Sequence, residues 1–252
     1  MLALAAVLAV AIGVALGLLG GGGSILTVPI LRYALGLSAH TAVAGSLFVV
    51  AVTSAVALVA HARAGRVRWR TGLLFGATGM VGAFAAGRVA HFIPAPVLLI
   101  GFAGMMVATA IAMLRPRRAG APKPVVVDEL PVGKVLAEGL VVGAVTGLVG
   151  AGGGFLVVPA LAMLGGLPLP VAIGTSLLVI AMKSTAGLTG YLGTVDIPWV
   201  PVLVVTGAAV LGSLFGGRWA GRVDETVLRR GFGWFVLAMA ALVLWQEIGA
   251  LL

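Results

Sequence analysis

Two glycine-rich runs have the composition of an anion-binding turn. Each run is followed directly by a short apolar segment, Ile25–Leu35 in one case and Phe155–Gly165 in the other. If these segments are helical, free amide groups and the positive end of a helix dipole favour a negative charge at the glycines. The runs consist of Gly20, Gly21, Gly22, Gly23 and Ser24, and of Gly150, Ala151, Gly152, Gly153 and Gly154.

The apolar segments after the glycines are too short to cross a membrane comfortably. Each has 11 residues, which as a helix would span only about 16 Å of a hydrocarbon core that is about 30 Å thick. We therefore expect re-entrant half-helices. Irregular backbone is tolerated at this depth only where it is buried in protein or lines a wet cavity, so the glycine runs are predicted to line a central site. Close helix packing is the competing interpretation, and it fits the spaced pairs Gly13/Gly17 and Gly143/Gly147 better than the runs.

Lys183 lies in the middle of an apolar stretch, where an ionisable side chain is costly and usually functional. Snorkelling to the interface suits residues near helix ends better than this position. We therefore predict that Lys183 faces the substrate route and balances the charge of an anion. The equivalent position in the first half of the chain is Thr53, and we include it in the predicted site.

Several hydroxyl side chains lie in the same apolar stretches. Most Ser and Thr residues in such helices donate to a backbone carbonyl of their own helix, and we expect this of the majority here. Ser46 and Ser176, which are equivalent, are the expected exceptions. Together with Thr175 they are predicted to add hydrogen bonds to the anion. The hydroxyl residues considered are Ser46, Thr53, Ser54, Thr175, Ser176, Ser184 and Thr185.

The composition identifies a helical membrane protein. Of 252 residues, 61% are hydrophobic and 9% are charged, compared with about 25% charged residues in an average soluble domain. No stretch shows the strict alternation of a transmembrane barrel strand, so the predicted fold class is all-α and polytopic. The apolar stretches are Leu2–Leu19, Thr41–Ala60, Gly72–Ala90, Val97–Leu114, Val171–Leu192, Val200–Trp219 and Phe232–Trp245, with a shorter one, Val135–Val149, that contains Glu138.

The chain contains an internal duplication with a constant offset of 130 residues. The alignment pairs single tryptophans, prolines and arginines as well as glycines, which a bias in composition would not produce. Examples are Pro29 with Pro159 and Trp69 with Trp199. The halves are predicted to be residues 1–115 and 131–252, joined by a Pro-rich, charged cytoplasmic linker at 116–130.

Basic residues in short loops mark the cytoplasmic side of a membrane protein. Three basic groups fall on one side only if each glycine-broken segment enters and leaves the membrane on the same side. The two halves then have opposite orientations, as in many secondary transporters, and both termini are outside. The groups are Arg63, Arg66, Arg68 and Arg70; Arg115, Arg117, Arg118, Lys123 and Lys134; and Arg218, Arg222, Arg229 and Arg230.

Several functions are disfavoured by the residues. The net charge of +9 resides in short loops, so nucleic-acid binding is not expected. The chain has no cysteine, and its histidines, His40, His61 and His91, lack metal-ligand spacing and fit an interfacial role. No paired acids or Ser-His arrangement lie within the apolar stretches, so we expect neither an enzyme nor a bound cofactor. The partners expected are a small anion and the lipid bilayer.

The duplicated motif also carries a family resemblance. The pattern G-x-x-G-x-G-G and V-P occurs at Gly17–Pro29 and Gly147–Pro159, and A-x-x-x-S-L follows at Ala42–Leu47 and Ala172–Leu177. With these motifs the whole chain resembles the TauE/SafE family. The resemblance implies a permease of the cytoplasmic (inner) membrane that exports sulfite, an organosulfonate or a similar anion. An anion channel is the alternative, followed by a non-transporting scaffold; the sequence does not specify the anion, the coupling ion or the oligomeric state.

Overall fold

The computed structural model describes residues 2–19, 26–115, 132–149, 157–158, 161, 167–219 and 225–249. These residues form helices and no strand, which confirms the predicted all-α class. Every apolar stretch predicted from the sequence falls within one helix, to within a residue at its ends. The long helices are α1 (Leu2–Leu19), α3 (Ala39–Arg63), α4 (Trp69–Val89), α5 (Ala95–Leu114), α6 (Val132–Val149), α8 (Leu169–Tyr191), α9 (Trp199–Trp219) and α10 (Glu225–Gly249).

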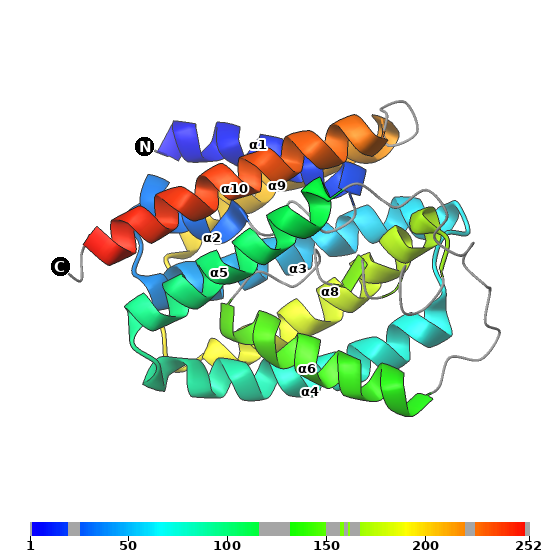
Figure 1. Ribbon diagram of the computed structural model, residues 1–252, viewed down its shortest axis with the longest axis horizontal. Coiled ribbons are helices and arrows are strands. Elements are labelled where there is room, and N and C mark those ends of the chain that lie inside the picture. Colours follow the sequence, from blue (N-terminus) through cyan, green and yellow to red (C-terminus); the bar gives the residue numbers. More distant parts are fainter. Residues whose placement is uncertain are drawn as a thin grey trace.

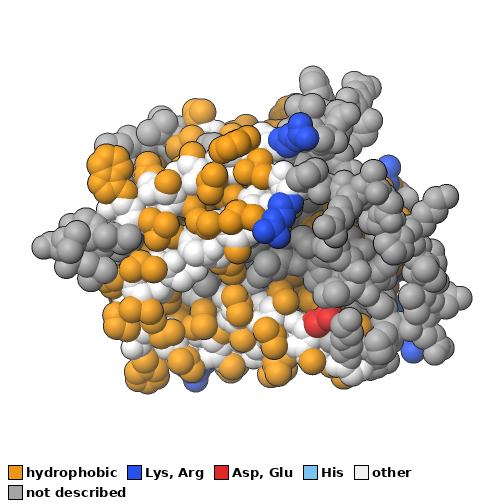
Figure 2. All heavy atoms as spheres, in the orientation of Figure 1, with side chains coloured by type: hydrophobic (Ala, Val, Ile, Leu, Met, Phe, Trp, Pro, Cys, Tyr) orange, Lys and Arg blue, Asp and Glu red, His pale blue; other side chains and the backbone are white. Residues whose placement is uncertain are grey.

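The composition and length of these helices suit a membrane. Within the described residues, 4 helical segments are long and apolar enough to cross one: Ala39–Arg63, Trp69–Phe92, Pro170–Tyr191 and Trp199–Gly217. Figure 2 shows hydrophobic side chains spread over the middle of the visible face, with most of the Lys and Arg side chains towards one end. Large apolar side chains such as Val81, Phe215 and Trp245 are exposed on the molecule. A surface of this kind is expected to contact lipid.

The helices run side by side along the long axis of the molecule (Figure 1). The start of α1 and the end of α10 lie at one end, together with the turns before α3, between α4 and α5, and between α8 and α9. The turn between α3 and α4 and the start of α6 lie at the opposite end. As a result, α1 and α6 begin at opposite ends of the bundle.

The closest helix packing pairs elements from different halves of the chain. Helix α1 packs on α9 and α6 packs on α4, while α3 and α8 cross in the centre. Glycines allow the backbones to touch: a Cβ atom at Gly13 would overlap the carbonyl oxygen of Ala209, and one at Gly143 would overlap that of Gly79. Gly13 and Gly143 are equivalent, as are Ala209 and Gly79, so the same backbone contact occurs twice. Such small-residue seams are typical of membrane helix pairs.

A short helical element precedes α3. It consists of α2 (Thr27–Pro29) and η2 (Ile30–Ala34), a single turn of π-helix. Gly36 then takes φ +71°, which glycine adopts without a steric cost, and the Ser38 side chain caps α3 by accepting the N–H of Thr41 at 3.2 Å. Leu31 lies against Gly45 of α3, so the element returns alongside that helix.

The second half repeats part of this element. The backbone N–H of Leu37 donates to the carbonyl of Leu31 at 3.2 Å, and the N–H of Leu167 donates to that of Leu161 at 3.2 Å. Residues 157–158 are helical. Apart from Leu161, the rest of the predicted half-helix Phe155–Gly165 lies outside the described residues.

Candidate functional site

Lys183 is buried in the middle of the bundle. It lies in the fourth turn of α8, and only 1% of its surface is exposed. Its Nζ donates a hydrogen bond of 3.2 Å to Thr146 Oγ1 on α6. Thr146 Oγ1 in turn donates to the carbonyl of Val142 at 2.6 Å, so its proton is already used. Among the described residues no carboxylate pairs with Lys183.

A glycine makes room for the lysine stem. A Cβ atom at Gly79 of α4 would lie 2.7 Å from Lys183 Cδ and 2.9 Å from Cγ. Any larger residue at this position would displace the lysine. The ammonium group is therefore enclosed by α4, α6 and α8, and Thr146 and Gly79 are two contributors that sequence reasoning did not identify. Both belong to other helices, so no local signal near Lys183 indicates them.

The predicted hydroxyl residues lie at different depths. Thr53 and Lys183 sit near the centre of α3 and α8, whereas Ser46 and Ser176 each lie two turns away along their helices, about 10 Å. Thr175 is near the basic end of the bundle, where its Oγ1 accepts the backbone N–H of Arg68 at 3.0 Å. The structure therefore places Thr53 and Lys183 at a similar depth and the others above or below them.

Most hydroxyls bond to their own helix, as expected, but the exceptions differ from the predicted ones. Ser46 donates to the carbonyl of Val43 at 2.9 Å and Ser176 to that of Ile173 at 2.7 Å. The buried hydroxyls without a hydrogen-bond partner in the described part of the chain are instead Ser54 and Ser184, together with Thr27 in α2. A hydroxyl rotamer is not readable from sequence, and the predicted contact of Ser46 and Ser176 with an anion stays a prediction.

The glycine runs Gly20–Ser24 and Gly150–Gly154 lie outside the described residues. The end of α6 that leads to the second run is held in place by Tyr191 at the end of α8. The Tyr191 hydroxyl donates to the carbonyl of Leu148 at 3.0 Å, with Gly147 O at 3.4 Å. These carbonyls belong to the last turn of α6, which lacks intrahelical partners for them.

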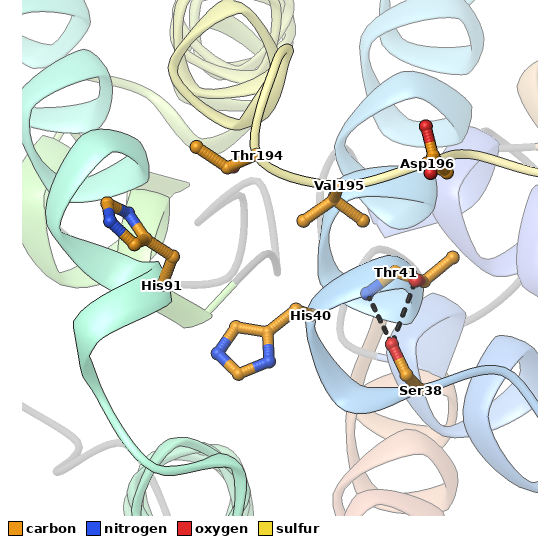
Figure 3. A pocket seen from close by; sticks show the side chains of 7 residues that line it. All are labelled: Ser38, His40, Thr41, His91, Thr194, Val195 and Asp196. Carbon is orange, nitrogen blue, oxygen red and sulfur yellow. Dashed lines mark hydrogen bonds between the residues drawn. The ribbon is translucent and has the colours of Figure 1, made fainter.

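A separate hollow of about 460 Å³ opens at the end of the bundle that carries the first turn of α3 (Figure 3). Its polar groups are largely used in local structure: Ser38 Oγ donates to Thr41 Oγ1 at 2.8 Å, and His40 Nε2 lies 3.2 Å from the carbonyls of Ala90 and Ile93. None of the predicted site residues lines it. The lining residues are Ser38, His40, Thr41, His91, Thr194, Val195 and Asp196.

The histidines divide between two environments. His40 and His91 line the terminal hollow, which agrees with positions near helix ends. His61 differs from the interfacial role expected of it: it is 6% exposed, and its Nδ1 has no hydrogen-bond partner within the described residues. In the described part of the chain no group of His, Asp and Glu residues could hold a metal ion.

Comparison with known proteins identifies relatives over almost the whole chain. The profile of the family described as "Sulfite exporter TauE/SafE" matches residues 5–243. A "Probable membrane transporter protein" of Xylella fastidiosa (strain Temecula1) is 35% identical over 246 residues, covering 95% of this chain and 94% of the relative. A protein also described as a probable membrane transporter, from Bacillus subtilis (strain 168), is 26% identical over 221 residues, which cover 86% of this chain and 90% of the relative.

No solved structure matches the chain. The family profile extends from within α1 to within α10 and includes the duplicated glycine motifs and Lys183. The chain therefore belongs to the TauE/SafE family of membrane proteins.

Proposed function

We propose that the protein is a secondary transporter that exports a small oxyanion, such as sulfite or an organosulfonate. The observation that carries the proposal is Lys183, an ammonium group that is buried among three helices and bonded to the neutral hydroxyl of Thr146. A charge in a membrane interior is expensive and is retained where function needs it. An anion that enters the site would supply the missing negative charge.

Alternating access at the interface of two inverted repeats is the proposed mechanism. Three observations support it. Helices α1 and α6 begin at opposite ends of the bundle (Figure 1). Each packs on the equivalent partner in the other half, α9 and α4 respectively. Finally, α3 and α8 cross in the centre, where two halves that rock against each other would share a site.

The proposed orientation follows from the charged turns. Arg63, Arg66 and Arg68 lie at or beside the turn between α3 and α4, at the end of the bundle where α6 and α10 begin (Figure 1). With this end in the cytoplasm, the protein spans the inner membrane and both termini are outside.

The anion would be held by groups from both halves. Backbone N–H groups of the two glycine runs would bind its oxygens, Lys183 would balance its charge, and hydroxyls near the centre would add hydrogen bonds. Thr53 is the central hydroxyl of the predicted set, although its proton is donated to the carbonyl of Val49 at 2.7 Å in this structure. Ser46, Thr175 and Ser176 would contact the anion elsewhere along its path.

The comparisons support transport and the class of substrate. The family description names sulfite export, and the relatives are described as membrane transporters. A small divalent or monovalent oxyanion fits a site with one buried ammonium group and several neutral donors. The alternative within transport is an anion channel, which would use the same residues without alternating access.

Counterflow of labelled sulfite in proteoliposomes tests the proposal, with a panel of sulfonates as competitors. We expect saturable uptake that is accelerated by anion inside the liposomes, because a carrier exchanges its substrate. Lys183→Met should abolish or strongly reduce this flux while the protein remains folded. Arg88→Met, which removes an exposed charge from α4, is the matched control and should keep wild-type flux.

The assay has clear contrary outcomes. Normal flux in Lys183→Met would refute the role of the lysine. A steady, non-saturating anion current would identify a channel. Wild-type liposomes that accept no sulfite or sulfonate would overturn the proposed substrate class.

A further inference from the structure

Two buried hydroxyls in the centre of the bundle break the pattern of the others. Ser54 is 0% exposed and Ser184 is 1% exposed, and neither hydroxyl has a hydrogen-bond partner among the residues that the structure describes. Other hydroxyls of the described helices donate to a carbonyl three or four residues earlier in their own helix. These are Ser46, Thr53, Thr78, Thr146, Ser176, Thr185, Thr189, Thr206 and Ser213.

The two exceptions are related by the internal duplication. Ser54 of α3 and Ser184 of α8 are separated by the repeat offset of 130 residues. A single unpartnered hydroxyl is easily attributed to local packing. The same departure at equivalent positions of both halves indicates a shared requirement. The residues directly beside the two serines differ, since they are Thr53 and Ala55 in α3 but Lys183 and Thr185 in α8.

The two residues lie on the facing sides of α3 and α8. Leu47 of α3 lies next to Gly187 of α8, with Leu47 Cδ1 3.3 Å from where a Cβ of the glycine would be. Ala57 of α3 packs in one cluster with Leu177 of α8. Ser54 follows Leu47 by seven residues and Ser184 follows Leu177 by seven, so each lies on the same helix stripe as a contact residue.

The contacts also fix the level of the two serines along the bundle. Because α3 and α8 are antiparallel (Figure 1), the contact of Leu47 with Gly187 and the cluster that Ala57 and Leu177 share bracket the centre of the crossing. Both Ser54 and Ser184 fall inside this bracket. Lys183 precedes Ser184 in α8 and is turned towards α4 and α6, so a charge and a free hydroxyl project from adjacent positions.

We propose that Ser54 and Ser184 are a pair of hydrogen-bond donors that bind the transported oxyanion where α3 and α8 cross. The inference rests on the proposed transport function and deepens it by naming the specificity-determining residues. Each hydroxyl has one proton to donate, and an oxyanion has several oxygens, so one anion accepts from both halves at once. A buried donor without a partner is costly, and the substrate is the group that satisfies it.

Alanine variants separate this role from a structural one. Ser54→Ala, Ser184→Ala and the double variant remove donors that have no partner in the described part of the chain, so the melting temperature should be unchanged or higher. The KM for sulfite in proteoliposomes should rise about tenfold or more for each variant, the effect of losing a hydrogen bond to a charged group. The rise in KM in the double variant should be at least as large as the rise in either single variant.

Ser213→Ala in α9 is the matched control. Ser213 is also 1% exposed, but it donates to the carbonyl of Val210 at 2.9 Å. Its KM should equal that of the wild type, and its melting temperature should not rise.

The outcomes distinguish this inference from the proposed function. A wild-type protein that transports sulfite, with alanine variants of unchanged KM, overturns the role of the serines and leaves the transporter intact. Alanine variants that lose melting temperature and show no change in KM assign the serines to packing and also overturn it. If the wild type neither transports sulfite nor is stabilised against heat by sulfite in detergent, both proposals fall.

Discussion

The hydrogen bond between Lys183 and Thr146 determines whether the lysine is satisfied in the absence of substrate. Nζ has Thr146 Oγ1 as its acceptor, at 3.2 Å, and the acceptor is fixed because its own proton is donated to Val142 O. A lone ammonium group inside the protein is otherwise left without an acceptor, which is costly. Thr146 therefore stabilises the empty state of the site.

Thr146→Val should therefore destabilise the protein. It removes the acceptor from a buried charged donor, and the expected cost is about 1–3 kcal/mol. Thermal unfolding of the purified protein in detergent measures the loss. Thr146→Ser keeps the oxygen and should retain most of the stability.

Thr206→Val provides the comparison for that experiment. Thr206 is buried in α9 and donates only to its own helix, to the carbonyl of Val202 at 2.7 Å. Its replacement should change the melting temperature much less than Thr146→Val does. Equal losses in the two valine variants would contradict a specific role for the Lys183 contact.

Gly79→Ala should disturb the lysine and leave the fold in place. The added methyl group would meet Lys183 Cδ and Cγ, which can move because they belong to a flexible side chain. We expect lower sulfite flux and a small change in melting temperature. Adding Gly79→Ala to Lys183→Met should lower the residual flux of that variant no further, because the two changes act through one side chain.

Gly101→Ala controls for the loss of glycine itself. A Cβ atom at Gly101 of α5 would meet nothing within 4 Å. Replacing an unconstrained helix glycine by alanine usually raises stability by roughly 0.5–1 kcal/mol. Flux in Gly101→Ala should match that of the wild type. Wild-type flux in Gly79→Ala would show that transport tolerates displacement of the lysine.

At the residue scale, the sequence indicated Lys183 as a candidate site residue because a charged side chain in a long apolar stretch is conspicuous. It could not predict Thr146 or Gly79, since these are brought to Lys183 only by the packing of α4 and α6 on α8. It also named Ser54 and Ser184 among the hydroxyls of these stretches, but it separated Ser46 and Ser176 from the rest as the expected exceptions. That separation depends on side-chain rotamers, which follow from three-dimensional packing.

Contacts between whole helices are determined by small residues in two equivalent seams. In the seam between α6 and α4, a Cβ atom at Gly143 would lie 2.6 Å from Gly79 Cα and 2.7 Å from its carbonyl carbon. Backbone atoms cannot rotate away as side chains can. The helices would have to separate, and the packing of the whole seam would suffer.

Gly143→Ala should therefore destabilise the protein although alanine is the better helix former. The expected cost of overpacking is about 1–3 kcal/mol, measured as a lower melting temperature and a smaller monodisperse fraction in size-exclusion chromatography. Gly13→Ala in the seam between α1 and α9 should give a similar loss. Gly207→Ala in α9, where a Cβ meets nothing within 4 Å, should be neutral or stabilising; an equal loss there would rule out the seam as the cause.

At the element scale, the sequence was informative because apolar stretches of about 20 residues have few alternatives to a helix in this composition. The bounds of α1 were predicted to the residue, and the spaced glycines of Gly13/Gly17 and Gly143/Gly147 were correctly taken as suited to close packing. The partner of each seam was not predictable. Nothing in a helix such as α1 indicates that its partner is α9, which belongs to the other half of the chain.

The arrangement of the whole molecule connects the duplication to the proposed mechanism. Helix α1 packs on α9 of the second half, and α6 packs on α4 of the first half, so neither half can form its glycine seam alone. The central helices α3 and α8 bring Thr53, Ser54, Lys183 and Ser184 to the crossing from opposite directions. Motion of one half against the other would therefore alter the central site directly.

The inverted orientation can be tested with two equivalent turn positions. Ala64 follows α3 and Thr194 follows α8; they are 130 residues apart in sequence, and both are exposed. In Figure 1 these turns lie at opposite ends of the bundle. The chain has no cysteine, so single cysteines can be introduced without removing others.

Ala64→Cys and Thr194→Cys should react with a membrane-impermeant maleimide from opposite sides of the membrane. In intact spheroplasts we expect labelling at position 194 only, because the basic turn at position 64 belongs in the cytoplasm. Position 64 should become reactive after permeabilisation, and the unmodified chain should never label. Equal labelling of both positions in intact spheroplasts would place the two turns on one side, and two halves of the same orientation could not share the proposed alternating site.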